Sequence, residues 1–313
     1  MQSAKKKNIQ VQSKTKRHPP SATWRVGDLI RDRYEVYDIK EGGIGIVYIV
    51  YDHHDGAPYA IKTLQGRHLV NPIAAERFIR EAEVWVRLGR HQNIVRAFFV
   101  DRIDGQPYIF LECVVGSNLR KALARGPVPI RTVLSYAIQF CRGMVHAQEK
   151  IPGFAHLDIK PENCLLTQEN ILKVSDFSLS KALFEPNPSF KAAPQTKIPV
   201  PKEKEKVMGT LPYMSPGHFL NFGRADIQSD IYSFGVMLYE MLTGKRPFFA
   251  ESVPQWRDVH LKVKPVEPRA MVPSISEGLN DLTMRCLAKN PAEKPENFAV
   301  IMDTLEGDFC GNS

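Results

Sequence analysis

The chain has 313 residues, of which 43% are hydrophobic and 24% are charged, a composition typical of a globular protein and not of a fibrous or wholly disordered one. At roughly 150 residues per domain, this length predicts about two compact units with a sizeable core. The formal net charge is +8. Most of this charge comes from six basic residues in the first 22 positions, a segment without any acidic residue: Lys5, Lys6, Lys7, Lys14, Lys16 and Arg17.

The basic segment lacks helical or strand periodicity. We therefore interpret residues 1–24 as a solvated disordered tail, and a dedicated nucleic-acid or membrane arm as the less favoured alternative. No apolar run follows the N-terminal lysines, and none reaches about 18 residues, which argues against a signal peptide and a membrane span.

The cysteines occur singly and in an odd number, so neither metal-binding spacing nor a disulfide framework is indicated. They are Cys113, Cys141, Cys164, Cys286 and Cys310. This pattern predicts reduced thiols and a cytoplasmic protein.

The first part of the chain has strand character in five segments, which span residues 34–39, 46–51, 58–64, 94–102 and 108–111. Between the third and fourth segments, apolar residues change to helical spacing over residues 73–88. Turn residues join neighbouring segments at 53–56 and 103–105. The economical prediction is an antiparallel sheet of five strands with one helix.

Beyond residue 116 the signal is mainly helical, with the clearest segments at residues 130–149, 226–242, 276–288 and 298–305. This change divides the chain into an N-lobe at 25–112, a hinge at 113–118, a C-lobe at 119–309 and a short tail at 310–313. Prolines and lysines crowd a segment of about residues 183–206, which predicts an exposed disordered insert.

Two polar motifs follow the hinge. Residues 156–163 read His-Leu-Asp-Ile-Lys-Pro-Glu-Asn, and residues 176–178 read Asp-Phe-Ser after a short strand-like run. Together they place a base, a phosphate-binding cation and two metal-ligand side chains on neighbouring loops, which is the equipment for moving a phosphoryl group from ATP.

Further motifs appear in a consistent order. A glycine-rich segment spans 39–48, Ala-Ile-Lys ends at Lys62, residues 209–216 read Gly-Thr-Leu-Pro-Tyr-Met-Ser-Pro, and residues 229–235 read Ser-Asp-Ile-Tyr-Ser-Phe-Gly. Over roughly residues 33–306 the chain resembles the eukaryotic-like (Hanks-type) serine/threonine protein kinases, especially bacterial members. The resemblance implies an α+β, bilobal kinase fold and transfer of the γ-phosphate of Mg-ATP to Ser/Thr hydroxyls of proteins.

The same resemblance assigns roles to individual residues. Asp158 would accept the hydroxyl proton or orient the attacking oxygen, and Lys160 would neutralise charge on the phosphoryl group. Lys62 would hold the α- and β-phosphates, oriented by Glu81 on the first helix. The expected metal ligands are Asn163 and Asp176.

The nucleotide would also be held by loop glycines, by apolar side chains around the adenine and by hinge backbone groups. The expected cofactor-binding residues are Gly42, Gly43, Gly45, Val47, Ala60, Lys62, Glu112, Val114 and Leu165.

Around these residues, the resemblance implies a stack of Trp85, His156 and Phe177 between the lobes. Thr210 would bond to Asp158 and Lys160 in residues 156–163, the catalytic loop, and Asp230 would anchor the backbone around His156. Glu162 is expected either to favour a basic residue in the acceptor peptide or to face the ribose.

Four residues depart from the family pattern, and none of them removes a reacting group: Lys40, Leu157, Ser178 and Gly217. Leu157 stands where an arginine normally receives a phosphorylated activation segment, which predicts a non-RD enzyme whose activity does not need that phosphate. Gly217 and Lys294 replace the halves of a buried ion pair, so we expect Lys294 to reach solvent and the lower lobe to be looser.

Two other functions remain open at this stage. A pseudokinase would bind nucleotide and regulate a partner without efficient transfer, and the four departures favour it. A small-molecule kinase resembling aminoglycoside phosphotransferases shares a His-x-Asp and a downstream Asn, but lacks the later motifs. The expected partners are protein substrates, with self-association for autophosphorylation as a possibility and no specific nucleic acid.

Overall fold

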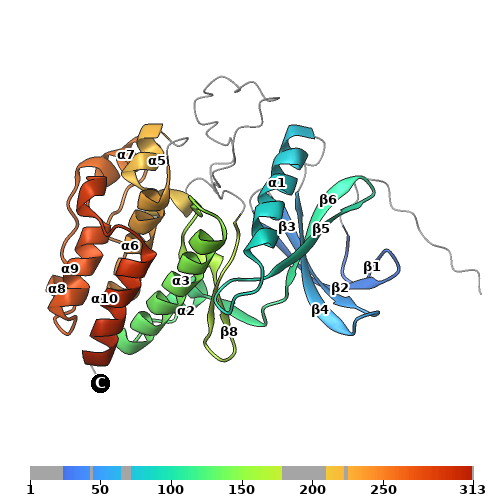
Figure 1. The fold of residues 1–313 in the computed structure, drawn as a ribbon, viewed down its shortest axis with the longest axis horizontal. Helices are drawn as coiled ribbons and strands as arrows, with labels where there is room; N and C mark the ends of the chain where they lie inside the picture. The colour runs from blue at the N-terminus through green and yellow to red at the C-terminus, as the bar shows by residue number, and fades with distance from the viewer. Residues whose placement is uncertain (1–23, 43–44, 65–71, 178–208, 222–224, 312–313) are drawn as a thin grey trace, which may run out of the picture.

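The computed structural model describes residues 24–42, 45–64, 72–177, 209–221 and 225–311. The predictions made for the tail before residue 24, for Gly43, for Ser178 and for the insert at 183–206 lie outside these residues. A strand-rich lobe and a helical lobe stand side by side (Figure 1). The α+β, two-lobed architecture is therefore confirmed.

The N-terminal lobe is a sheet with the strand order β1-β2-β3-β4-β6-β5, in which all neighbours are antiparallel. Its strands are β1 (Leu29–Ile30), β2 (Tyr34–Gly42), β3 (Gly45–Asp52), β4 (Ala57–Leu64), β5 (Ala97–Ile103) and β6 (Gln106–Glu112). The five predicted strands are present, but the count was wrong because β1 adds a sixth. A strand of two residues is too short to show alternation in the sequence.

The helix α1 (Pro72–Leu88) packs against β5 and β6, where the change of period predicted a helix. Its apolar side buries Phe78, Ala82 and Trp85, and the indole N–H of Trp85 donates to the Val95 carbonyl at 2.7 Å. This bond ties α1 to the chain segment that precedes β5.

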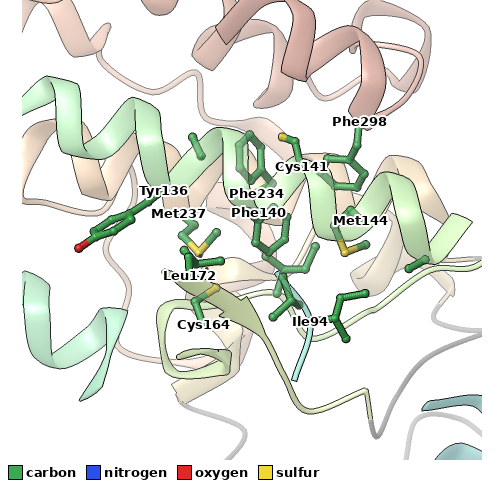
Figure 2. Close-up of a cluster of buried hydrophobic side chains, with 14 of the residues drawn as sticks. Ile94, Tyr136, Phe140, Cys141, Met144, Cys164, Leu172, Phe234, Met237 and Phe298 are labelled. Atoms are coloured by element: carbon green, nitrogen blue, oxygen red, sulfur yellow. Dashed lines mark hydrogen bonds between the residues drawn. The ribbon is translucent and has the colours of Figure 1, made fainter. Parts of the chain in front are cut away.

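The C-terminal lobe is built around α3 (Ile130–Lys150) and α6 (Ile227–Thr243), and α10 (Phe298–Gly311) packs along α3. Figure 2 shows aromatic rings from all three helices meeting in the core, with the centroids of Phe140 and Phe234 5.2 Å apart and those of Phe140 and Phe298 5.8 Å apart. The remaining helices are α2 (Leu119–Leu123), α5 (Pro216–Asn221), α7 (Val253–Lys262), α8 (Pro268–Met271) and α9 (Glu277–Cys286).

Local chemistry sets the ends of α6. The Asp226 side chain caps its N-terminus by accepting from the Gln228 backbone N–H at 3.0 Å, and Gly244 ends it in the left-handed conformation at φ 70°. The bounds predicted from the sequence, residues 226–242, differ from those of α6 by one residue at each end.

A second, small antiparallel sheet comprises β7 (Gly116–Asn118), β8 (Cys164–Thr167) and β9 (Leu172–Val174). The strand-like run predicted before Asp176 corresponds to β9, whereas β7, β8 and the sheet itself were not predicted. Its strands have three or four residues, which is too few for a clear period. The sheet matters for the site because β8 begins directly after Asn163 and β9 ends two residues before Asp176. No helix in the described part of the chain is long and apolar enough to span a membrane.

Candidate active site

The catalytic loop brings four polar side chains together. Lys160 Nζ lies 2.9 and 2.8 Å from the two carboxylate oxygens of Asp158 and donates to the Thr210 hydroxyl at 2.9 Å. Thr210 in turn donates to Asp158 Oδ1 at 3.3 Å. Asn163 Nδ2 donates to the Asp158 carbonyl at 2.8 Å and to its Oδ2 at 3.0 Å. The predicted contacts of Thr210 are present, and the Asp158 carboxylate is held from three sides.

The backbone under this loop is tied to α6. The fully buried carboxylate of Asp230 accepts the N–H of His156 at 2.6 Å and the N–H of Leu157 at 2.8 Å. Burial raises the pKa of Asp230 to about 7, although the two amides favour its charged form. Leu157 has φ 65°, a conformation that is strained for a branched side chain. The predicted anchor is therefore observed, and it holds a strained residue next to Asp158.

The aromatic stack between the lobes is also present. The rings of Trp85 and Phe177 have centroids 5.2 Å apart, and those of His156 and Phe177 are 4.8 Å apart. His156 is completely buried, and its Nε2 donates to the Ser175 carbonyl at 3.0 Å. Burial lowers the pKa of this imidazole. The stack joins α1 to both polar loops.

The ion pairs of Lys62 and Glu81 differ from the expected arrangement. The Lys62 ammonium contacts Asp176 Oδ1, whereas Glu81 accepts from Arg77, one turn earlier on α1, at 2.8 Å. No hydrogen bond joins Lys62 to Glu81 in this structure, where both residues are described. Burial raises the pKa of Glu81, and the charges of Arg77 and Lys62 oppose that rise. Each charged group thus has a partner, but Lys62 is not oriented by Glu81 here.

The glycine loop and its sheet fit a nucleotide. A Cβ on Gly45 would come within 2.9 Å of the Thr63 carbonyl, so only glycine lets the loop backbone lie this close to β4. Val47 lies opposite Lys62 in the sheet. Val47, Ala60, Val114 and Leu165 all belong to, or pack against, the largest apolar cluster. Gly42 ends β2, and Gly43 lies outside the described residues.

The two expected metal ligands also fit their role. Because Asn163 uses its Nδ2 to donate to Asp158, its amide oxygen remains as a possible ligand. The carboxylate of Asp176 is one-third exposed. Oxygen donors of this kind suit Mg²⁺. Asn163 and Asp176 do not depend on a larger cluster, since the described residues contain no group of three or more His, Cys, Asp or Glu that could hold a metal ion.

At the end of β6, Glu112 has both its N–H and its carboxylate engaged. The N–H donates to the Arg96 carbonyl at 2.8 Å, and the carboxylate pairs with Lys173 at 3.0 Å. Any contact of Glu112 with adenine must therefore use its carbonyl oxygen.

With the geometry in hand, the chain can be compared with known proteins. The model of the protein kinase domain matches residues 35–305.

The chain belongs to the protein kinase domain family.

Among curated relatives, serine/threonine-protein kinase A of Synechocystis is 32% identical over 296 residues, covering 89% of this chain and 53% of the relative. Serine/threonine-protein kinase PksC of Streptomyces coelicolor is 33% identical over 281 residues, with 87% and 48% covered. PknB of Mycobacterium leprae is 29% identical over 282 residues, with 88% and 43% covered. The chain spans about half the length of these relatives or less.

Sequence reasoning missed one cluster in the kinase domain. Arg120 donates to Glu162 at 2.7 Å and to Glu240 at 2.8 Å, and it also contacts the Tyr213 hydroxyl. Tyr213 donates to Glu240 at 2.5 Å. The signal that could have found the cluster is Glu240, the acidic residue within the apolar run at 231–242. The charge of Glu162 is compensated by Arg120, and this pairing was not among the expectations for Glu162.

The expectation for Lys294 was wrong. Lys294 is only 8% exposed, because its Nζ donates to the Gln228 carbonyl at 2.7 Å and lies 5.6 Å from the centroid of the Tyr232 ring. Burial lowers its pKa to about 8. A Cβ on Gly217 would lie 3.2 Å from Ser229 Oγ, so there is little room for a side chain at this position. A backbone carbonyl and an aromatic face thus hold the cation without a carboxylate.

Proposed function

We propose that this kinase domain transfers the γ-phosphate of Mg-ATP to serine or threonine hydroxyls of proteins. The observation that carries the proposal is the arrangement of Asp158, Lys160 and Thr210. One carboxylate is fixed beside one ammonium and one hydroxyl, and their backbone is tied to α6.

Each of these residues would have a different role in the transfer. Asp158 orients the acceptor hydroxyl and accepts its proton, since its carboxylate is held on three sides and cannot turn away. Lys160, 2.8 Å from Asp158, brings positive charge to the phosphoryl group during transfer. Asn163 and Asp176 would hold Mg²⁺, which supplies charge neutralisation at the phosphates when bound.

Lys62 has a different partner in each state of this proposal. In the present structure it contacts Asp176. In the nucleotide complex we expect it to hold the α- and β-phosphates, with Glu81 orienting it and with Gly42, Gly43, Gly45, Val47, Ala60, Glu112, Val114 and Leu165 surrounding the nucleotide.

We further propose that activity does not require phosphorylation of the activation segment. Leu157 is 6% exposed and packs with Ala155 and Ala225, so this position offers an apolar side chain where a phosphate would need a cation. Phosphatase treatment should leave the rate unchanged; a large loss traced to a phosphate between residues 178 and 210 would contradict this.

Location and partners follow by the same reasoning. All five cysteines are free thiols, which supports a cytoplasmic location. The partners we propose are proteins with Ser/Thr acceptors, and these include a second copy of the chain where autophosphorylation occurs.

The test is transfer of labelled γ-phosphate from Mg-ATP to the chain itself and to a generic basic protein. Asp158→Asn is the matched variant because it keeps the shape of the side chain and removes its charge. Label on Ser or Thr that disappears in the variant is the expected result. Nucleotide binding without any label in the parent chain would instead favour a regulatory scaffold.

A further inference from the structure

The segment that carries Thr210 depends on the C-terminal lobe for its shape. Residues Leu211–Tyr213 form a single 3₁₀ turn, closed by a long bond from the Met214 N–H to the Leu211 carbonyl at 3.3 Å. A shorter bond to the same carbonyl comes from His260 Nε2 at 3.0 Å. His260 lies on α7, is fully buried, and belongs to none of the motifs that define the site.

For a neutral imidazole, the hydrogen bonds around His260 have only one consistent set of directions. Because a carbonyl can only accept, His260 Nε2 carries the proton that is donated to Leu211. Its Nδ1 then accepts from the Tyr232 hydroxyl at 3.0 Å, and the Tyr232 oxygen accepts from Lys289 Nζ at 3.0 Å. The result is a buried chain that runs from Lys289 through Tyr232 and His260 to Leu211, in which each donor meets an acceptor.

The surroundings keep the ring neutral and in place. Aromatic side chains pack around it, with centroid distances of 5.2 to 5.7 Å, from Phe219, Tyr232, Phe248 and Trp256. Burial lowers the pKa of His260 to about 3, and the nearby charge of Lys289 adds to this effect. The imidazole therefore stays a fixed donor to Leu211 under ordinary conditions.

We propose that His260 is a positioning residue for phosphoryl transfer, which acts through the Leu211 carbonyl to hold the Thr210 hydroxyl against Asp158 and Lys160. The proposal rests on the function proposed above. Leu211 directly follows Thr210, so a shift of the Leu211 backbone is passed on to Thr210. The Thr210 hydroxyl lies 2.9 Å from Lys160 and 3.3 Å from Asp158. Small displacements of such groups have large effects on rate.

Two substitutions at His260 remove the imidazole ring, but only one of them removes the hydrogen-bond donor to Leu211. His260→Gln places an amide N–H near the position of Nε2, whereas His260→Asn is too short to reach Leu211. We expect His260→Asn to lower kcat about tenfold, the usual weight of one buried hydrogen bond, and His260→Gln to recover most of the loss. Tyr232→Phe, which keeps the ring but no longer fixes the tautomer, should lose about threefold. His54→Asn, on an exposed turn, is the matched control and should not change kcat.

A double-mutant cycle with Thr210→Val tests the route of the effect. If His260 acts through Thr210, adding His260→Asn to Thr210→Val should lower kcat by less than about twofold. An equal tenfold loss in both backgrounds, or equal rates for the Asn and Gln variants, would overturn the proposal.

Hydrogen–deuterium exchange of a peptide covering residues 209–216 provides a readout that needs no activity. His260→Asn should speed exchange there about tenfold, while His260→Gln and His54→Asn should not. Failure of the parent chain to transfer phosphate would refute the proposed function, and exchange would still decide whether His260 holds this segment. Unchanged exchange in His260→Asn would overturn the inference.

Discussion

Replacing Asp230 with alanine should disable the catalytic loop by a mechanism that leaves every reacting group in place. The change leaves two buried backbone N–H groups, those of His156 and Leu157, without the acceptor they have at 2.6 and 2.8 Å. An unsatisfied buried donor costs about 1–3 kcal/mol, so the two together predict a loss of about 4 kcal/mol in the free energy of unfolding. Leu157, at φ 65°, would also be released from a strained conformation.

This release explains why activity should fall as well as stability. Leu157 immediately precedes Asp158, so relaxation of its backbone turns the Asp158 carboxylate away from Lys160 and Thr210. We expect kcat for γ-phosphate transfer to fall at least a hundredfold in Asp230→Ala under conditions where the protein is still folded. Urea unfolding followed by tryptophan fluorescence gives the stability, and a transfer assay in the absence of urea gives kcat.

The matched control is Asp226→Ala, four residues earlier in the chain, at the N-terminal cap of the same helix. Asp226 is exposed and caps α6 through one bond to the Gln228 N–H at 3.0 Å. Loss of such a cap costs about 1 kcal/mol, and kcat should stay within twofold of the parent. Equal losses of stability in the two variants, or normal kcat in Asp230→Ala, would refute the anchoring argument.

Three further substitutions test the charges around the site. Arg77→Ala removes an i,i+4 pair worth about 0.3–0.5 kcal/mol and should leave the transfer rate unchanged or raise it up to about twofold. Glu81→Gln should instead lower kcat/KM for ATP at least tenfold, and equal losses in the two variants would contradict this. His218→Gln should reduce acid sensitivity. The pKa of buried His218 is lowered to about 4, so on acidification the unfolded state takes up the proton first, and the free energy of unfolding falls by about 2 kcal/mol between pH 7 and 5. Urea midpoints that fall in parallel in the parent and the variant would contradict this. Lys294→Met should stabilise the fold by about 1–2 kcal/mol at pH 7. The lysine pKa of about 8 means that burying the charge costs stability below pH 8. A loss of more than about 1 kcal/mol in urea unfolding would contradict this prediction.

The elements that the sequence predicted are those whose periodicity is long enough to be seen. The helix α6 has 17 residues with a capping aspartate and a terminal glycine, and its predicted bounds differ by one residue from those observed. By contrast, β1 has two residues and β7 has three, so no alternation exists to be recognised. The position of β7 depends on its pairing with β8, which begins only at Cys164, and a single sequence does not display such a long-range pairing.

The same limit applies to the site. Residues that share a motif, such as Asp158 and Asn163, were predicted together and lie together. The partners of Lys62 and Lys294 were not predicted, because they lie far away in the chain. Lys294 bonds to Gln228, 66 residues earlier, and no local pattern announces that contact.

Because residues four apart share a helix face, the sequence could have predicted the pairing of Arg77 with Glu81. It could not have predicted that Lys62 would contact Asp176 instead of Glu81. Arg77 is 62% exposed, whereas Lys62 is 13% exposed. Screening by water makes the Arg77 pair weak, while the desolvated Lys62 gains more from an acidic partner. In a nucleotide complex, phosphate oxygens would compete with Asp176 for the Lys62 ammonium, and Mg²⁺ would compete with Lys62 for the Asp176 carboxylate. We therefore expect nucleotide binding to draw Lys62 away from Asp176. Glu81 is the largely buried carboxylate on α1, and because its pair with Arg77 is weak, it can turn toward Lys62 at little cost. We expect the orientation of Lys62 by Glu81 to follow nucleotide binding and not to precede it.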